Sequence, residues 1–214
     1  MSRRSIDETV KIEDLLREEY FDLLPEIRRV VWQLDTEIRY LTLPILQTLK
    51  SHEQLIIRSR VKECESAIKT LRGQSDGRIF IPERAGEYSL LSLPDLAGVR
   101  VLVFPNDRLA EVRQVLEPHF QNWTSKPVRD SDGEPLAPKY FGYCEDVSRR
   151  IYAEYQIVPM LLGLFWEVEH SAMYKSELVA NSRNMQRRRA EVESALSRFE
   201  EGIASLLPDG SQPS

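Results

Sequence analysis

The segment Ile151–Ile157, IYAEYQI, alternates apolar and polar side chains with a period of two. Successive side chains of a β-strand point to opposite faces, so this pattern predicts a strand with one apolar face and one face that carries Glu154 and Gln156. A second segment, Gly98–Phe104 (GVRVLVF), is rich in β-branched residues and predicts another strand. The chain must therefore build a sheet, and one face of that sheet is apolar.

Helical periodicity surrounds these strands. Apolar residues recur at three- and four-residue steps from about Glu13 to Leu49, and we expect Pro25 and Pro44 to mark a helix start and a kink or break. Further helices are expected over residues 53–71, 107–118 and, in two segments, 160–207. Shorter strands are expected over residues 79–81, 120–128 and 140–143. This order predicts an α+β fold, in which a small mixed β-sheet is flanked by N- and C-terminal helices.

Composition narrows the classes of function. The 214 residues carry a formal net charge of −5, so a global basic footprint for nucleic acid is absent, although a local basic pocket remains open. Cys64 and Cys144 form no CxxC pair, which argues against a disulfide framework and a structural zinc site. The N-terminal residues lack the apolar segment of a signal peptide, and the longest apolar run, near Val158–Trp166, is too short to span a bilayer. We therefore expect a cytoplasmic protein.

A basic group of side chains lies in the segment expected to form the second helix. Its members are Arg60, Lys62, Ser66 and Lys69. On a helix, Lys62 and Ser66 are four residues apart and share a face. Guanidinium, ammonium and hydroxyl groups on one face can hold a polyphosphate. A solvated helix face is the alternative interpretation of the same residues.

Two carboxylates are placed at the expected strands. Asp95 comes just before the strand that begins near Gly98, and Glu154 lies on the polar face of the strand over residues 151–157. Together they could hold Mg²⁺ beside the phosphates of a nucleotide, or Glu154 could take a proton from an attacking hydroxyl. The alternatives are a turn or capping aspartate and an exposed sheet face.

These groups occur in an order that resembles a known family. The matching blocks are RVKECESAIK, SLPDLAGVRVLV, KYFGY, AEYQI and FWEVEHSAMYK. In this order the chain resembles the RelA/SpoT synthetase family, and especially its small single-domain alarmone synthetases. The resemblance covers about Ile57 to Lys175, and it implies a nucleotidyltransferase-like fold.

The resemblance implies that a pyrophosphate group moves from ATP to the ribose 3′-hydroxyl of a guanine nucleotide, giving (p)ppGpp. By position, Arg60 and Arg100 would sandwich the adenine by cation–π stacking. Lys62, Ser66 and Lys69 would hold the ATP phosphates. Asp95 would bind Mg²⁺, and Glu154 would support the metal or activate the 3′-hydroxyl. On the acceptor side, Tyr143 would stack on the base, Lys139 would meet phosphates, and Gln156 would contribute to the same subsite.

The acceptor side departs from the family pattern. Where the family has Arg, Ser and His after its Gly-Tyr, this chain has Cys144, Glu145 and Val147. Gly163 stands where the family has an asparagine, and Lys69 lies one position off the usual spacing. Three alternatives follow: a different acceptor, such as another nucleotide or an RNA end; a catalytically degenerate nucleotide-binding or interaction module; or a damaged hairpin. A helical assembly protein is a further alternative.

The same resemblance suggests how the chain divides. We expect an N-terminal helical segment over residues 1–50 and a RelA/SpoT-like nucleotidyltransferase domain over residues 51–180. A C-terminal helix over residues 181–207 and a disordered tail over residues 208–214 would follow. The flanking helices are the expected place for a homo-oligomer contact, because residues 183–206 carry an amphipathic stripe.

Overall fold

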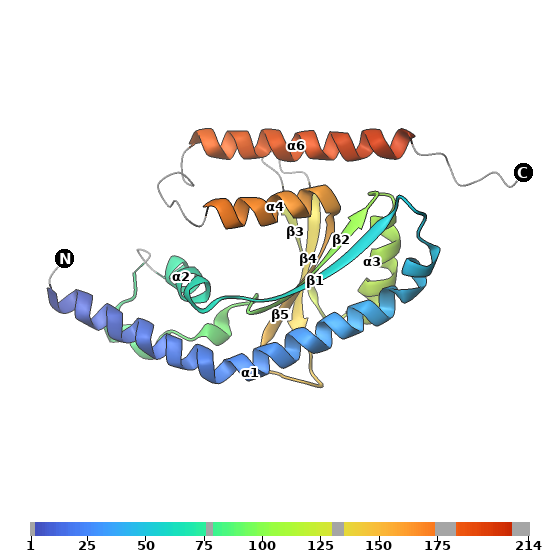
Figure 1. The fold of residues 1–214 in the computed structure, drawn as a ribbon. Coiled ribbons are helices and arrows are strands. Elements are labelled where there is room, and N and C mark those ends of the chain that lie inside the picture. The colour runs from blue at the N-terminus through green and yellow to red at the C-terminus, as the bar shows by residue number, and fades with distance from the viewer. Residues whose placement is uncertain (1–2, 76–78, 130–134, 174–182, 207–214) are drawn as a thin grey trace, which may run out of the picture.

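The computed structural model describes residues 3–75, 79–129, 135–173 and 183–206. Its elements are α1 (Arg3–Thr48), β1 (Gln54–Val61), α2 (Cys64–Gln74), η2 (Pro82–Glu87), η3 (Leu90–Ser92), β2 (Ala97–Phe104), α3 (Arg108–His119), β3 (Thr124–Arg129), β4 (Pro135–Tyr143), β5 (Tyr152–Pro159), α4 (Met160–Met173) and α6 (Arg183–Leu206). Helices α1, α4 and α6 flank a central sheet (Figure 1), so the expected α+β architecture with helices on both sides is confirmed.

The sheet has five strands in the order β1-β2-β5-β4-β3. Strands β2 and β5 are parallel, and the other neighbouring pairs are antiparallel, so the sheet is mixed as the sequence predicts. The two predicted strands with the clearest patterns are therefore direct neighbours at the centre of the sheet. In their register, Gly98 pairs with Glu154 and Arg100 pairs with Gln156.

Helix α1 covers one face of the sheet. Its inward residues Ile27, Leu34 and Ile38 are fully buried, and they pack in one cluster with the apolar side chains of β2 and β5. The helix is continuous through Pro25 and Pro44, so the expected start and break at these residues are wrong. Both prolines lie on the exposed side of a helix that curves around the sheet (Figure 1), where water can bind the carbonyls that proline leaves unpaired.

The segment expected to be the second helix divides into a strand and a helix. Residues 54–61 form β1, an edge strand paired antiparallel with β2, and only residues 64–74 form α2. The helix prediction over residues 53–71 is therefore wrong in its first half. The β-branched residues Ile56, Ile57 and Val61 favour the strand once β2 offers a partner. The predicted strand at 79–81 is also absent, and the predicted strand at 120–128 begins only at Thr124.

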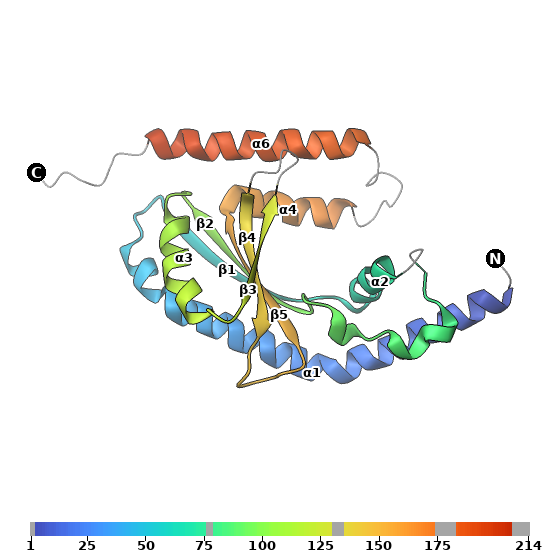
Figure 2. The same ribbon diagram turned by 180° about the vertical axis from the view of Figure 1, so that it is seen from behind.

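Helices α4 and α6 lie over the other face of the sheet. Figure 2 shows, from behind, α4 above the strand ends and α6 stacked on α4. Indole Nε1 of Trp166 donates to Glu193 Oε1 at 2.8 Å, and the backbone N of Leu161 donates to Glu200 Oε1 at 2.9 Å. Among the described residues after Met160, the expected helical structure is thus confirmed over Met160–Met173 and Arg183–Leu206. The described helices include none with the length and apolarity needed to cross a membrane.

The predicted division of the chain at residues 50 and 180 stays a prediction. The predicted disordered tail lies outside the described residues, as do Tyr174 and Lys175 of the last family-like block. The side chain of His170 in that block is outside them as well.

Candidate functional site

The face of the sheet toward α4 is apolar at one end and polar at the other. Leu102, Ala137 and Val158 pack under α4 at the apolar end. Because neighbouring residues on paired strands share a face, the register places the following side chains along the polar remainder: Arg58, Arg60, Arg100, Lys139, Phe141, Glu154 and Gln156. We call this set the polar strip.

Asp95 lies at the end of the polar strip where β1 ends and β2 begins. Lys62 Nζ is 2.6 Å from Asp95 Oδ2, and Arg60 Nη2 is 3.8 Å from the same oxygen. The backbone N of Lys62 also donates to the carbonyl of Leu96 at 2.9 Å, which ties the end of β1 to the loop that carries Asp95. The other carboxylate oxygen, Oδ1, is buried and has no hydrogen-bond partner among the described residues.

The Arg60 side chain lies across Gly98 on the polar strip. A Cβ atom at Gly98 would lie 3.5 Å from Cγ of Arg60, so the Arg60 side chain passes over this position. Glu154 is the strand partner of Gly98 on β5. Arg60 therefore reaches Asp95 with its guanidinium from the polar face of the sheet, and the strand register places Glu154 on that same face.

Glu154 is buried in the middle of the polar strip. Gln156 Nε2 donates to Glu154 Oε1, and Lys139 Nζ on β4 is 3.6 Å from Glu154 Oε2. Gln156 Oε1 in turn accepts from Arg100 Nε at 3.2 Å. These four side chains are therefore linked in one network of donors and acceptors across β2, β5 and β4.

Arg100 is the most enclosed cation of the strip. Burial lowers its pKa, the neighbouring charges of Arg60 and Arg58 lower it further, and Glu167 and Glu154 oppose these effects. Its Cζ lies 5.9 Å from the centroid of the Trp166 ring on α4. A guanidinium stays charged under these conditions because its ordinary pKa is above 12.

The remaining predicted site residues are spread more widely. Ser66 and Lys69 lie on α2, and Lys62 lies before it, so the predicted shared helix face of Lys62 and Ser66 is wrong. The reason is that β1 extends to Val61 and the helix starts only at Cys64.

Tyr143 lies at the end of β4, exposed, with its ring centroid 4.8 Å from that of Tyr152. Tyr152 also lies parallel to Phe141, at 6.5 Å between ring centroids. The strip thus continues beyond Glu154 and Lys139 into an aromatic surface.

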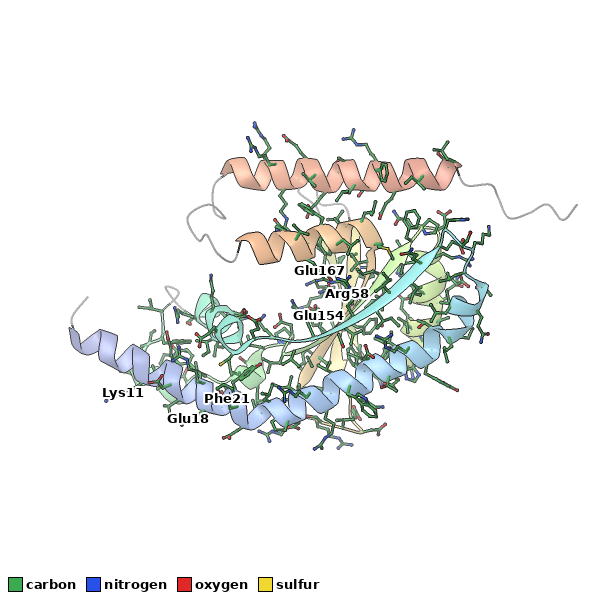
Figure 3. All side chains as sticks on the ribbon, in the orientation of Figure 1. Lys11, Glu18, Phe21, Arg58, Glu154 and Glu167 are labelled. Carbon is green, nitrogen blue, oxygen red and sulfur yellow. The ribbon has the colours of Figure 1, made fainter. Side chains whose placement is uncertain are left out.

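Sequence reasoning missed Arg58 and Glu167. Arg58 lies two residues before Arg60, so a strand puts both on one face, but the helix prediction for this segment hid that relation. Glu167 on α4 forms an ion pair with Arg58 (Figure 3), and no local pattern in the sequence signals a pair 109 residues apart.

A cavity of about 450 Å³, lined in part by Tyr143 and Tyr152, lies between α1, α3 and the β4–β5 loop. Its lining includes the acidic residues Glu37, Glu145 and Asp146. Cys144 also lines it, and burial raises the pKa of this thiol to about 12. None of the carboxylates or arginines of the polar strip lines this cavity, so we place the candidate site on the strip rather than in the cavity.

The described residues contain no group of three or more His, Cys, Asp or Glu side chains that could hold a metal ion. Mg²⁺ is commonly held by only one or two carboxylates, with substrate phosphates and water completing the shell. The buried, unpartnered Oδ1 of Asp95 suits such an ion, and Glu154 is the second carboxylate on the same side. The residues present therefore fit a magnesium site that a nucleotide completes.

No protein-family model matches the sequence, and no curated protein matches it. Solved structures do match. Small alarmone synthetase 1 from Bacillus subtilis, bound to its product pppGpp, superposes with a TM-score of 0.63 at 18% identity, covering 88% of this chain and 96% of that one. The same enzyme bound to AMPCPP gives a TM-score of 0.58 at 20% identity, with 87% and 96% covered. A GTP pyrophosphokinase family protein from Streptococcus pneumoniae gives 0.60 at 20%, with 88% and 92% covered. The chain therefore has the fold of the small alarmone synthetases.

Proposed function

We propose that this protein is an ATP-dependent pyrophosphokinase that acts on the 3′-hydroxyl of a guanine nucleotide. The observation that carries the proposal is the convergence of Asp95, Glu154 and the cations Arg60, Lys62 and Arg100 on one side of the sheet. The structures of similar fold that are bound to AMPCPP and to pppGpp support an ATP donor and a guanine-nucleotide product.

The donor would lie along β1 and β2. Lys62 would contact the ATP phosphates, and Ser66 and Lys69 on α2 would extend that contact. Arg60 and Arg100 would hold the adenine between their planar guanidinium groups, which bind aromatic rings by cation–π attraction.

Asp95 and Glu154 would hold Mg²⁺, which when bound supplies charge neutralisation to the phosphates. In the transfer, the 3′-oxygen of the acceptor attacks the β-phosphorus of ATP, the bond from that phosphorus to the α–β bridging oxygen breaks, and AMP leaves. Glu154 would accept the proton of the attacking hydroxyl, and Lys62 would stabilise charge on the transferring group. Most of the acceleration would come from positioning these groups before the reaction.

The acceptor would lie on the β4 side of the strip. Tyr143 would stack on its base, and Lys139 and Gln156 would contact its polar groups. Glu145 and Asp146 beside Tyr143 add negative charge at this end, which disfavours a 5′-polyphosphate. This observation favours a second candidate, in which the acceptor is a different nucleotide or an RNA end, or in which nucleotide binds without turnover.

The test is AMP release from ATP and Mg²⁺ with a panel of acceptors: GTP, GDP, GMP, ATP and a short RNA. We expect release with at least one guanine nucleotide, and we expect Asp95→Asn to reduce it by about 100-fold or more, as loss of a principal electrostatic group does. Asp107→Asn is the matched control, because Asp107 follows β2 as Asp95 precedes it and makes no side-chain capping bond.

The outcomes separate the candidates. Release only with RNA or a non-guanine nucleotide would move the proposal to a different acceptor. Binding of AMPCPP without release for any acceptor would show a nucleotide-binding module. Equal rates for Asp95→Asn and the control would contradict the assigned site.

A further inference from the structure

Glu167 on α4 lies above two arginines of the polar strip. Its Oε2 forms an ion pair with Nη1 of Arg58, and its Oε1 is 3.8 Å from Nη1 of Arg100. Arg58 and Arg100 are direct strand partners on β1 and β2, so one carboxylate bridges two adjacent cations. Figure 3 shows Glu167 on α4 next to Arg58, with Glu154 beneath them on the sheet.

Removal of the Glu167 carboxylate would make the present position of the Arg100 guanidinium less favourable. Burial disfavours the charge of Arg100, and two cations of β1, Arg60 and Arg58, disfavour it further. Glu167 and Glu154 are the acidic side chains that oppose this, and Glu154 is already bound to Gln156 and near Lys139. Without Glu167, repulsion from the β1 arginines would favour rotation of Arg100 toward solvent.

Two other neighbours contact Arg100 without fixing the rotation of its guanidinium plane. Gln156 accepts from its Nε, and its Cζ lies 5.9 Å from the Trp166 ring centroid. Glu167 is the contact to a terminal guanidinium nitrogen, so it fixes the rotation of the guanidinium plane that these two contacts leave open.

We propose that Glu167 is a positioning residue for the donor nucleotide, which holds the Arg100 guanidinium in the plane that the adenine ring stacks on. This inference rests on the proposed function, because it assigns Glu167 to the ATP subsite. Stacking depends on the orientation of the plane, so a displaced Arg100 weakens donor binding without touching the groups that carry the transfer.

The ion pair has little to do with the stability of the fold. Glu167 is 32% exposed and Arg58 is 47% exposed, and exposed pairs of this kind contribute little to unfolding free energy. Helix α4 is anchored independently, by its apolar contacts with Leu102 and Val158 and by its bonds to Glu193 and Glu200 on α6. A role in binding and a role in folding therefore predict different results.

The experiment measures the Kd of AMPCPP by calorimetry, the KM and kcat for ATP, and the melting temperature. For Glu167→Gln we expect Kd and KM to rise about fivefold, the size of effect expected when one of two contacting residues is changed. We expect kcat to stay within about twofold of wild type, because the groups that carry the transfer are unchanged, and the melting temperature to stay the same. Glu167→Asp keeps the charge on a shorter side chain, and we expect it to restore part of the affinity. Glu111→Gln is the matched control, because Glu111 pairs with Arg108 on α3, away from the strip, with similar exposure.

Failure of this inference differs from failure of the proposed function. If the wild-type protein does not bind AMPCPP, the ATP subsite itself is wrong. If wild type binds and Glu167→Gln binds equally well, the positioning role is overturned. Tighter binding by Glu167→Gln would also overturn it, since Glu167 would then compete with the ligand. A fall in affinity matched by a fall in melting temperature beyond the control would show a structural role instead.

Discussion

On the face toward α1, the central strands β2 and β5 carry Ala97, Val99, Val101, Val103, Ala153, Tyr155 and Ile157, none more than 3% exposed. On the face toward α4, the same strands carry Gly98, Arg100, Glu154 and Gln156, and become apolar only at Leu102 and Val158. One pair of strands thus supplies a continuous core on one side and a charged network on the other. The difference follows from the two-residue period of a strand, which lets each face be composed independently.

The comparison indicates where stability and chemistry reside. Burial of apolar surface is the main favourable contribution to folding, and the α1 face holds most of it. The α4 face gathers arginines and buried carboxylates that make no comparable contribution. A sheet can carry a group of charged side chains on one face when the other face supplies most of the buried apolar surface.

The largest expected effect tests this division. Leu34 on α1 is fully buried in the core, and Leu34→Ala should lower the unfolding free energy by about 3 kcal/mol, since a cavity forms in packed surroundings. Arg60→Met on the opposite face should change it by less than about 0.5 kcal/mol, because the Arg60 side chain is 45% exposed. Urea unfolding of both variants measures the difference. Comparable losses of unfolding free energy in the two variants would contradict the difference in stability proposed between the two faces of the sheet.

The sequence shows part of this arrangement and hides the rest. The alternation over residues 151–157 places Glu154 and Gln156 on one face without reference to any other segment. The helix prediction for residues 53–71 fails because an edge strand forms only when a partner is present, and that partner, β2, lies about 40 residues away. The connections from Arg58 to Arg100 and from Arg58 to Glu167 depend on this pairing, so no local pattern could reveal them.

The departures from the family pattern on the acceptor side also need the structure to explain them. Sequence comparison marks Cys144, Glu145 and Gly163 as departures from the family pattern, but gives no physical reason for them. The structure accounts for Gly163, because a Cβ there would lie 2.3 Å from Cδ2 of Leu102. An asparagine at this position would collide with the apolar end of the α4 face. The glycine therefore follows from the way that α4 packs on β2.

A smaller effect on stability is expected at the apolar end of the α4 face, where Gly163 packs on Leu102. Gly163→Ala should lower the unfolding free energy by about 1–2 kcal/mol, because Leu102 is fully buried and must shift to admit a methyl group. The control is Gly202→Ala on α6, also inside a helix, where a Cβ meets nothing within 4 Å. That change should stabilise the protein by up to about 1 kcal/mol through helix propensity. If both substitutions stabilise, α4 packs on the sheet more loosely than the structure indicates.

The smallest effect concerns a buried charge between α4 and α6. Glu200 is 1% exposed, and burial raises its pKa, although bonds from the Leu161 backbone and from Asn106 oppose the shift. Because the folded pKa lies above the unfolded one, the folded state binds more protons, and stability falls as pH rises from the unfolded pKa through the folded one. Glu200→Gln keeps an acceptor for Leu161 but cannot ionise. Relative to this variant, wild type should lose stability between acidic and neutral pH, as urea midpoints across that range would show. If the stability of wild type relative to Glu200→Gln instead rises with pH, the charged Glu200 carboxylate stabilises the contact between α4 and α6. Charge would then contribute to stability on the α4 side of the molecule.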